Sequence, residues 1–218
     1  MVPLQEDTVS ELAELRLQSR LNEILSTEFS FSVVGKQLRG IRGEVEMTVW
    51  LNPENRLKRV RTISIDCARP GDGENVYYQY GLSYASRGWG GCYEPTEKGW
   101  PEVILADFKK WAVPFIRDAV EPARIIEMIL AGDIPPSEGT GGMHGRIMSA
   151  LRIASTAGNA QEYESIRTYL MNVSMSRSVA RGLMMQPLFQ DLKMKPNVRW
   201  IGVSRQGDYV PSRSRLIT

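Results

Sequence analysis

The chain has 218 residues, more than a typical domain of roughly 100 to 150 residues and fewer than two, so its length favours one domain with a helical extension. It is 42% hydrophobic and 24% charged, as soluble globular proteins are, and no segment approaches the ~18 uncharged apolar residues of a membrane helix. A single histidine, His144, and two cysteines, Cys67 and Cys92, leave little material for acid–base, nucleophilic or metal chemistry.

The net charge of +2 is unevenly distributed along the chain. Residues 1–145 carry 16 lysines and arginines against 21 acidic residues, whereas residues 146–218 carry 11 against 4. A basic C-terminal third is typical of a tail that meets nucleic acid or an acidic surface. It is equally typical of a helical layer whose charges face the acidic remainder of the same fold, and we favour this second interpretation.

The first predicted element is a helix over residues 9–26. Thr8 and Glu11 have the spacing of a capping box, and the apolar residues that follow recur mostly with a period of 3.6. The period then changes to two over residues 29–33, where phenylalanine and valine alternate with serine. This alternation predicts a short strand.

Three further strands are predicted over residues 44–51, 57–67 and 75–85. The first of them alternates apolar and polar residues, as a half-solvated antiparallel strand does. Turn signals at residues 52–55 and 70–73 separate the strands and predict a meander. Because the leucines of the N-terminal helix need a surface that buries them, we predict an α+β fold in which that helix packs on one face of the meander.

Helices are predicted for most of the remaining chain, which forms a C-terminal helical layer. The first covers residues 102–112 and is expected to kink or stop before Pro114. The second covers residues 122–131, with Pro122 in its first turn and Gly132 as its C-terminal cap.

A helical hairpin follows, with arms over residues 146–157 and 160–171. A third helix is expected over residues 176–192, perturbed at Pro187. Beyond it we expect a loosely held tail with a short strand over residues 199–203 as the exception.

These predicted elements divide the chain into four parts. Residues 1–131 form the sheet domain with its following helices, and residues 132–145 form a Gly- and Pro-rich loop that contains His144. Residues 146–195 form a helical extension packed on the same domain, and residues 196–218 form a basic tail. The first residues lack a basic head followed by an apolar run, so we expect a cytoplasmic protein with reduced cysteines.

A loop at residues 87–91, with the sequence Arg-Gly-Trp-Gly-Gly, is the first candidate binding feature. Glycines let a backbone approach a ligand closely, and Arg and Trp often dominate the energetics of interfaces. The loop lacks the spacing of a phosphate-binding loop, and a surface loop with an anchoring tryptophan is the alternative. If the loop binds a partner, we expect Arg87, Trp89 and Tyr93 to make the contact.

A basic strand is the second candidate. Its residues Lys58, Arg59 and Arg61, together with Arg199 and Arg205 of the tail, could contact the phosphates of a nucleic acid. Basic residues on an edge strand also prevent edge-to-edge pairing, and this is the structural alternative.

Two other groups are interpreted as structural. Tyr78, Tyr80 and Tyr84 could stack bases, but they share a face with apolar residues and are predicted to lie in the core. Glu44 and Glu46 alternate with core residues, as solvated positions do.

For catalysis, the best assembly pairs Cys67 or Cys92 as nucleophile with His144 as base. Nothing in the sequence brings the histidine within hydrogen-bond reach of either thiol. We therefore predict that the protein is not an enzyme and uses no cofactor or metal.

Four short motifs carry a family resemblance. They are RTISID at residues 61–66, YQYGLS at 78–83, VPF at 113–115 and EPA at 121–123. Together with the helical hairpin, they make residues 12–171 similar to the bacterial domain-of-unknown-function family 4304. That family has no established catalytic residues. Its likeness to immunity proteins implies a protein-binding role.

The sequence thus favours a non-catalytic protein-binding module, of which an immunity protein that neutralises a bacterial toxin is the specific form. A nucleic-acid-binding accessory protein that uses the basic strand and tail is the alternative from another class. A structural component of a phage or secretion particle is the third.

Overall fold

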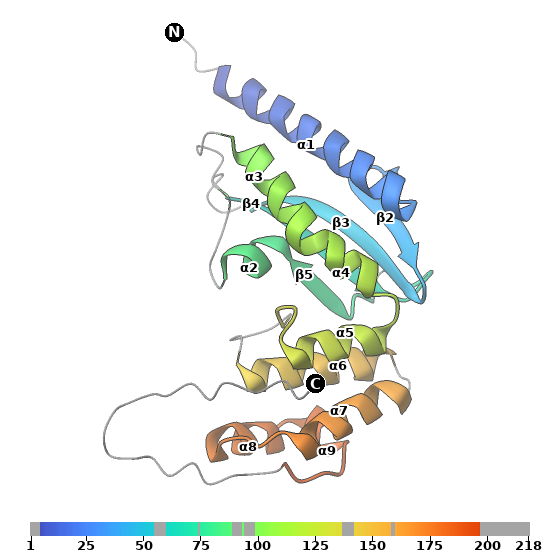
Figure 1. Ribbon diagram of the computed structural model, residues 1–218, viewed down its shortest axis with the longest axis vertical. Coiled ribbons are helices and arrows are strands. Elements are labelled where there is room, and N and C mark those ends of the chain that lie inside the picture. Colours follow the sequence, from blue (N-terminus) through green and yellow to red (C-terminus); the bar gives the residue numbers. More distant parts are fainter. Residues whose placement is uncertain are drawn as a thin grey trace, which may run out of the picture.

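The computed structural model describes residues 5–54, 60–73, 75–88, 93, 99–136, 142–157 and 160–196. It describes their side chains except at positions 5–14, 52–54, 60–62 and 160–161. The chain has the α+β fold that the sequence predicts, with an N-terminal helix on an antiparallel sheet and a helical layer beyond it (Figure 1).

The sheet contains strands β1 (Ser32–Val34), β2 (Gln37–Arg42), β3 (Val45–Glu54), β4 (Val60–Ala68) and β5 (Tyr78–Gly81), each antiparallel to the next. The predicted meander is confirmed. Strand β2 is an addition that the sequence did not reveal, because Gly40 stands where an alternating pattern needs a side chain. The ring of Phe31 lies against Gly40 in its place, where an added Cβ would come within 2.4 Å of the ring.

Helix α1 (Gln5–Phe29) is longer at both ends than the predicted 9–26. Its buried residues recur at every fourth position: Leu17, Leu21, Leu25 and Phe29. Phe29 therefore belongs to the helix and not to the strand predicted at 29–33, and Ser30 follows with a left-handed φ of 59°.

Strand β4 lies between β3 and β5, but β5 pairs only with its residues 64–67. Among the described residues, the start of β4 pairs with β3 alone, and Arg61 is the register partner of Pro53. Because Lys58 and Arg59 lie outside the described residues, the interpretation of the basic strand as an edge strand stays a prediction.

The strand predicted over residues 75–85 is wrong in its second half, where helix α2 (Leu82–Arg87) takes its place. Leu82 is buried, as a strand pattern requires, but it begins the helix. Tyr78 and Tyr80 are buried in β5, which confirms their predicted core position. Tyr84 instead lies on α2 and is half-buried.

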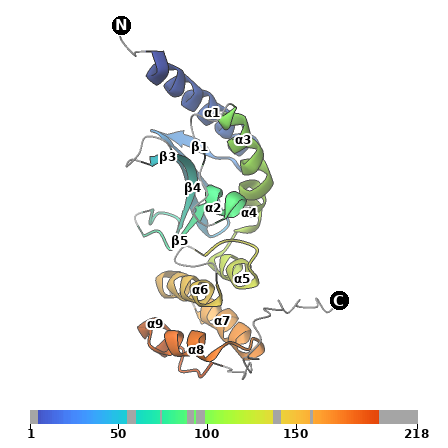
Figure 2. The ribbon, with the colours of Figure 1, turned by 90° about the vertical axis from the view of Figure 1, so that its left-hand side faces the viewer.

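Helix α3 (Trp100–Asp107), the π-helical turn η1 (Phe108–Ala112) and helix α4 (Val113–Asp118) follow one another without a break. The helix thus continues through Pro114, where we expected a kink or stop. A π turn just before a proline changes the hydrogen-bond register, which accommodates a residue that has no N–H and a bulky ring. Helices α1, α3 and α4 lie on the same side of the sheet (Figure 2).

The helical layer contains α5 (Pro122–Ala131), α6 (Met143–Ala157), α7 (Ala160–Asn172), α8 (Arg177–Met184) and α9 (Pro187–Gln190). Helix α5 has the predicted bounds, and Gly132 caps it with a φ of 88°. The two arms of the hairpin and the interruption before Pro187 are confirmed. His144 lies in α6 and not in a loop, because this helix begins three residues earlier than the pattern indicated.

The buried apolar side chains form one continuous core that extends from α1 to the segment after α9. Within the described ranges, no helix combines the length and the apolar character needed to cross a membrane. The short strand expected over residues 199–203 and most of the tail lie outside the described residues.

Candidate functional site

A hollow of about 290 Å³ lies where α2, η1, the segment after α5 and the start of α6 meet. We call it the α2–α6 hollow. The described residues that line it are Tyr84, Ala85, Gly88, Trp111, Gly132, Asp133, Ile134, Pro135, Pro136 and Arg146. Its volume is at the lower end of the range of small-molecule sites, so it has room for a side chain or a small ligand.

The segment after α5 forms one wall of this hollow and is held at both ends. At its start, the backbone N–H groups of Gly132 and Asp133 donate to the carbonyl of Met128 and so close the end of α5. At its other end, the hydroxyl of Tyr78 donates a 2.7 Å hydrogen bond to the carbonyl of Pro135. The wall is therefore anchored both to the helical layer and to the sheet.

Arg146 reaches the hollow from the first turns of α6. Its guanidinium lies against Gly132, where an added Cβ would be 2.6 Å from Nη1. Gly132 thus has two functions, because only glycine readily adopts its backbone conformation and only glycine leaves this space for the arginine.

The charges of the hollow are not neutralised by one another. The ion pairs between described residues elsewhere join Arg20 to Glu23, Arg117 to Glu28, Arg124 to Glu127 and Arg167 to Glu164. Neither Arg146 nor Asp133 forms such a pair with a described residue. Arg146 is half-buried, so water reaches its side chain only in part.

Trp111 supplies the aromatic surface of the hollow. Its side chain is 37% exposed, which is high for a tryptophan, and the ammonium of Lys110 lies 4.9 Å from its ring centroid. Tyr84 adds a second, half-buried ring from α2. The hollow therefore combines two aromatic rings with a guanidinium, and each of the three comes from a different element.

Of the residues predicted to bind a partner, the structure describes Arg87 and Tyr93, and it separates their roles. Arg87 is exposed in the last turn of α2, with its Cζ 4.4 Å from the ring centroid of Tyr93. Gly88 lines the hollow, and Trp89 lies outside the described residues. The predicted loop thus begins at the rim of the hollow.

Tyr93 is fully buried, so its side chain offers no surface to a partner and this part of the prediction needs correction. Its hydroxyl donates to the carboxylate of Asp107 at 2.8 Å and lies 2.8 Å from the hydroxyl of Ser86. Burial raises the pKa of the Tyr93 phenol above its ordinary value. Tyr93 therefore joins α2 to α3, a role that a lone loop residue does not signal in sequence.

The residues predicted to bind nucleic acid are largely outside the described part of the chain. Lys58, Arg59, Arg199 and Arg205 are among these, and Arg61 is described only in its backbone. The tyrosine stripe does not offer base-stacking surface, since the rings of β5 are buried in the core. Nucleic-acid binding by these basic residues stays a prediction.

No described group of residues has the arrangement of a catalytic or metal centre. The thiol of Cys67 is buried, and burial raises its pKa far above the ordinary value, so it stays protonated and is a poor nucleophile. His144 lies beside Gly182 of α8. Cys92 is outside the described residues, and among the described ones no cluster of histidine, cysteine and acidic side chains could hold a metal ion.

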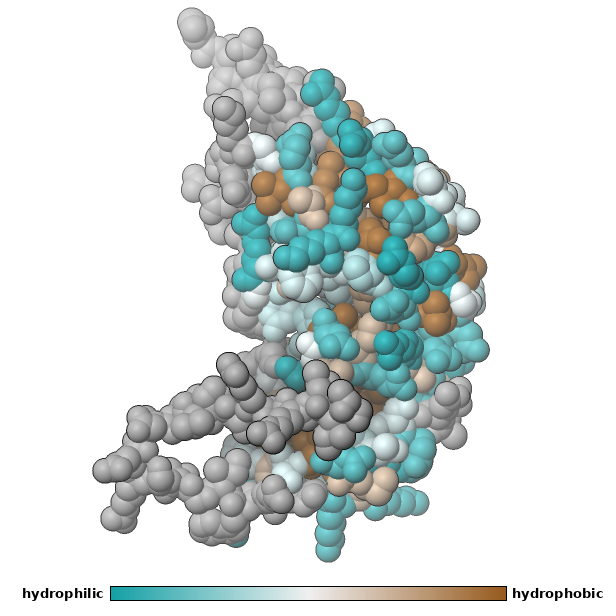
Figure 3. All heavy atoms as spheres, in the orientation of Figure 1, coloured by the Kyte–Doolittle hydropathy of each residue, from teal (hydrophilic) through white to brown (hydrophobic). Residues whose placement is uncertain are grey.

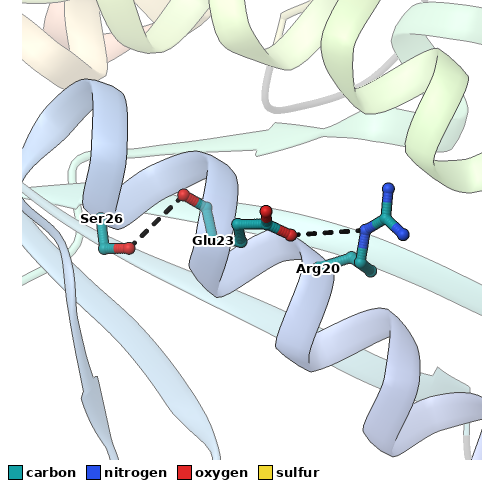
Figure 4. A network of polar contacts seen from close by, with 3 residues as sticks. All are labelled: Arg20, Glu23 and Ser26. Atoms are coloured by element: carbon teal, nitrogen blue, oxygen red, sulfur yellow. Dashed lines mark hydrogen bonds and ion pairs between the residues drawn. The ribbon is translucent and has the colours of Figure 1, made fainter.

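A larger groove of about 520 Å³ runs between α1 and α3, with an apolar floor of Ile24, Leu105 and Ala106. On its α1 side, Arg20 pairs with Glu23 at 3.5 Å, and Ser26 donates to the carbonyl of Glu23 (Figure 4). These contacts lie within one helix and are exposed, so they add little stability. Glu102 and Lys109 also line the groove and form no ion pair with a described residue.

On the face of the molecule shown in Figure 3, hydrophobic side chains are scattered between hydrophilic ones and form no single large patch. Apolar surface therefore does not select a site on this face. The aromatic rings of Tyr84 and Trp111 distinguish the α2–α6 hollow from the groove, whose described lining has no aromatic residue.

No family model, no curated protein and no solved structure matches this chain. The similarity to family 4304 stays a prediction from short sequence motifs.

Proposed function

We propose that the protein is a non-catalytic protein-binding module and that the α2–α6 hollow contacts its partner. The observation that carries this proposal is the convergence of Trp111, Tyr84 and Arg146 around one hollow. Tryptophan, tyrosine and arginine are the residue types that most often dominate the energetics of protein interfaces.

The anchoring of the walls of the hollow supports the same function. The hydrogen bond from Tyr78 to Pro135 and the cap at Gly132 hold one wall, and the contacts of Tyr93 hold α2 on the other side. A surface that is ordered before binding loses less conformational entropy when a partner docks. A partner side chain could therefore enter without rearrangement of the backbone.

The neutralisation of a bacterial toxin is the specific form of this proposal, and it depends on the resemblance to family 4304. The structure of the hollow fits any protein partner that presents a side chain of suitable charge. Identification of the partner is thus part of the test.

The test is affinity purification of the tagged protein from its native lysate at low and at high salt. We expect one stoichiometric protein to survive the high-salt wash and to be lost with Trp111→Ala. The matched control is Trp50→Ala, which removes a half-buried tryptophan of β3 that does not line the hollow. Retention of the partner by the Trp111→Ala variant would contradict the proposed site.

The nucleic-acid alternative has a different signature. Phosphate contacts release counterions, so such binding falls steeply with salt concentration. Nucleic acid that co-elutes only at low salt, with no stoichiometric protein, would favour the alternative. Substitution of Arg59 and Arg61 would then be the next experiment.

A further inference from the structure

We propose that the α2–α6 hollow receives a carboxylate side chain of the protein partner and that Arg146 binds this carboxylate. This inference rests on the proposed function, since it states which chemical group the partner inserts. It assigns Arg146 as the specificity-determining residue and Trp111 as the surface for the residue next to the carboxylate.

Charge complementarity supports an acidic group. Arg146 is half-buried, and no described carboxylate pairs with it. The arginines that do form ion pairs with described residues each pair with a glutamate. Lys110 lies close to Trp111, which is part of the lining. Arg146 and Asp133 are the charged residues of the described lining and form no ion pair with each other, which leaves the guanidinium for an acidic group of the partner.

Geometry supports a carboxylate in particular. A guanidinium is planar and offers two parallel N–H donors that match the two oxygens of a carboxylate. Gly132 leaves the Arg146 guanidinium space, and Ile134, Pro135 and Pro136 add apolar surface to the lining. Arg146 is half-buried, and partial exclusion of water strengthens an ion pair relative to one on an open surface.

A protein carboxylate fits better than the phosphates of a nucleic acid. The hollow presents one guanidinium and also one carboxylate, Asp133, which would repel a continuous polyanion. The same Asp133 is compatible with a polypeptide, whose backbone N–H groups and basic side chains can face it.

The experiment uses the full chain and two short probes, acetyl-Glu-Phe-amide and acetyl-Gln-Phe-amide, observed by NMR at the Arg146 Nε–H and the Trp111 indole N–H. The probes differ only in the charge of one side chain. We expect the glutamate probe to shift both signals and to bind about tenfold or more tightly than the glutamine probe, since a hydrogen bond to a charged group is lost.

Two variants test the role of Arg146. Arg146→Lys keeps the charge but loses the planar fork, and we expect it to remove most of the preference for glutamate. Gly132→Ala keeps the arginine but displaces its guanidinium, and we expect the same loss. The controls are Arg152→Lys on the same helix and Gly71→Ala, whose added Cβ meets nothing within 4 Å.

The outcomes separate the inference from the proposed function. Equal binding of the two probes, or no shift at Arg146, overturns the carboxylate inference. If Trp111→Ala still abolishes capture of the partner, the proposed function stands without it. A larger shift with inorganic phosphate or with a short single-stranded oligonucleotide than with the glutamate probe also overturns the inference, in favour of a phosphate ligand.

Discussion

The hydroxyl of Tyr78 donates a 2.7 Å hydrogen bond to the carbonyl of Pro135, and this contact joins the sheet to the segment that walls the α2–α6 hollow. The two residues are 57 positions apart in sequence. Tyr77, the preceding residue, is as deeply buried, but its hydroxyl has no hydrogen-bond partner among the described residues. The two adjacent tyrosines are thus similarly exposed but differ in the hydrogen bonding of their hydroxyls, and comparison of the two tests the Pro135 contact.

The first prediction is that Tyr78→Phe lowers the stability of the fold and that Tyr77→Phe does not. Tyr78→Phe removes a buried hydrogen bond and should lower the free energy of unfolding by about 1 kcal/mol. Tyr77→Phe removes an unsatisfied buried hydroxyl and should leave that free energy unchanged or raise it by up to about 1 kcal/mol. Urea unfolding of both variants measures the difference, and an equal loss in both would show that the Pro135 contact contributes nothing.

The second prediction concerns two glycines with the same type of backbone. Gly132 has a φ of 88° and Gly71 a φ of 82°, so alanine should destabilise the fold by about 1 kcal/mol at either position. Only at position 132 does the new methyl group meet another residue, the flexible end of Arg146. We therefore expect similar urea midpoints for the two variants, with a shifted Arg146 Nε–H signal only in Gly132→Ala.

A much lower stability of Gly132→Ala would contradict this expectation. It would mean that Arg146 cannot move aside and that the arginine supports the fold itself.

The third prediction tests the packing of Phe31 on β2. Gly40→Ala would place a Cβ 2.4 Å from the Phe31 ring, and overpacking of this kind costs about 1 to 3 kcal/mol. Gly73→Ala is the control, because its Cβ would lie at an ordinary 3.5 Å from the Glu46 side chain. Unfolding in urea should show a lower free energy of unfolding for the first variant and a change of less than about 0.5 kcal/mol for the second.

The fourth prediction is a loss of stability in alkali. Burial raises the pKa of Tyr77, Tyr78, Tyr80 and Tyr93 above the ordinary value of 10.0. The folded protein therefore keeps these phenols protonated at a pH where the unfolded chain releases the protons. Their contribution to stability is complete below pH 10.0 and falls as the pH rises above it.

For a phenol as buried as that of Tyr78, the free energy of unfolding falls by at most about 1.4 kcal/mol per pH unit above the ordinary pKa. Urea unfolding at a series of pH values on either side of 10 measures the slope. Tyr77→Phe, which removes one of the buried phenols, should reduce it. A free energy of unfolding that does not change through this range would rule out the assigned burial.

Local patterns in the sequence determined most of the secondary structure. Helix α5 was predicted with its observed bounds because Pro122 and Gly132 mark a helix start and end through backbone chemistry alone. The central strands were predicted because their alternation reports one buried face. Such signals depend only on neighbours in the chain.

Tertiary packing decided the rest. The second half of the strand predicted at 75–85 became α2 although its apolar spacing suited a strand, and Tyr93 became a core residue although nothing near it in sequence is periodic. The α2–α6 hollow brings together Tyr84, Trp111 and Arg146 from elements far apart in the chain. The sequence by itself determined most of the helices and strands, whereas these three residues line one hollow only because the sheet, the π turn and the helical layer pack around one core.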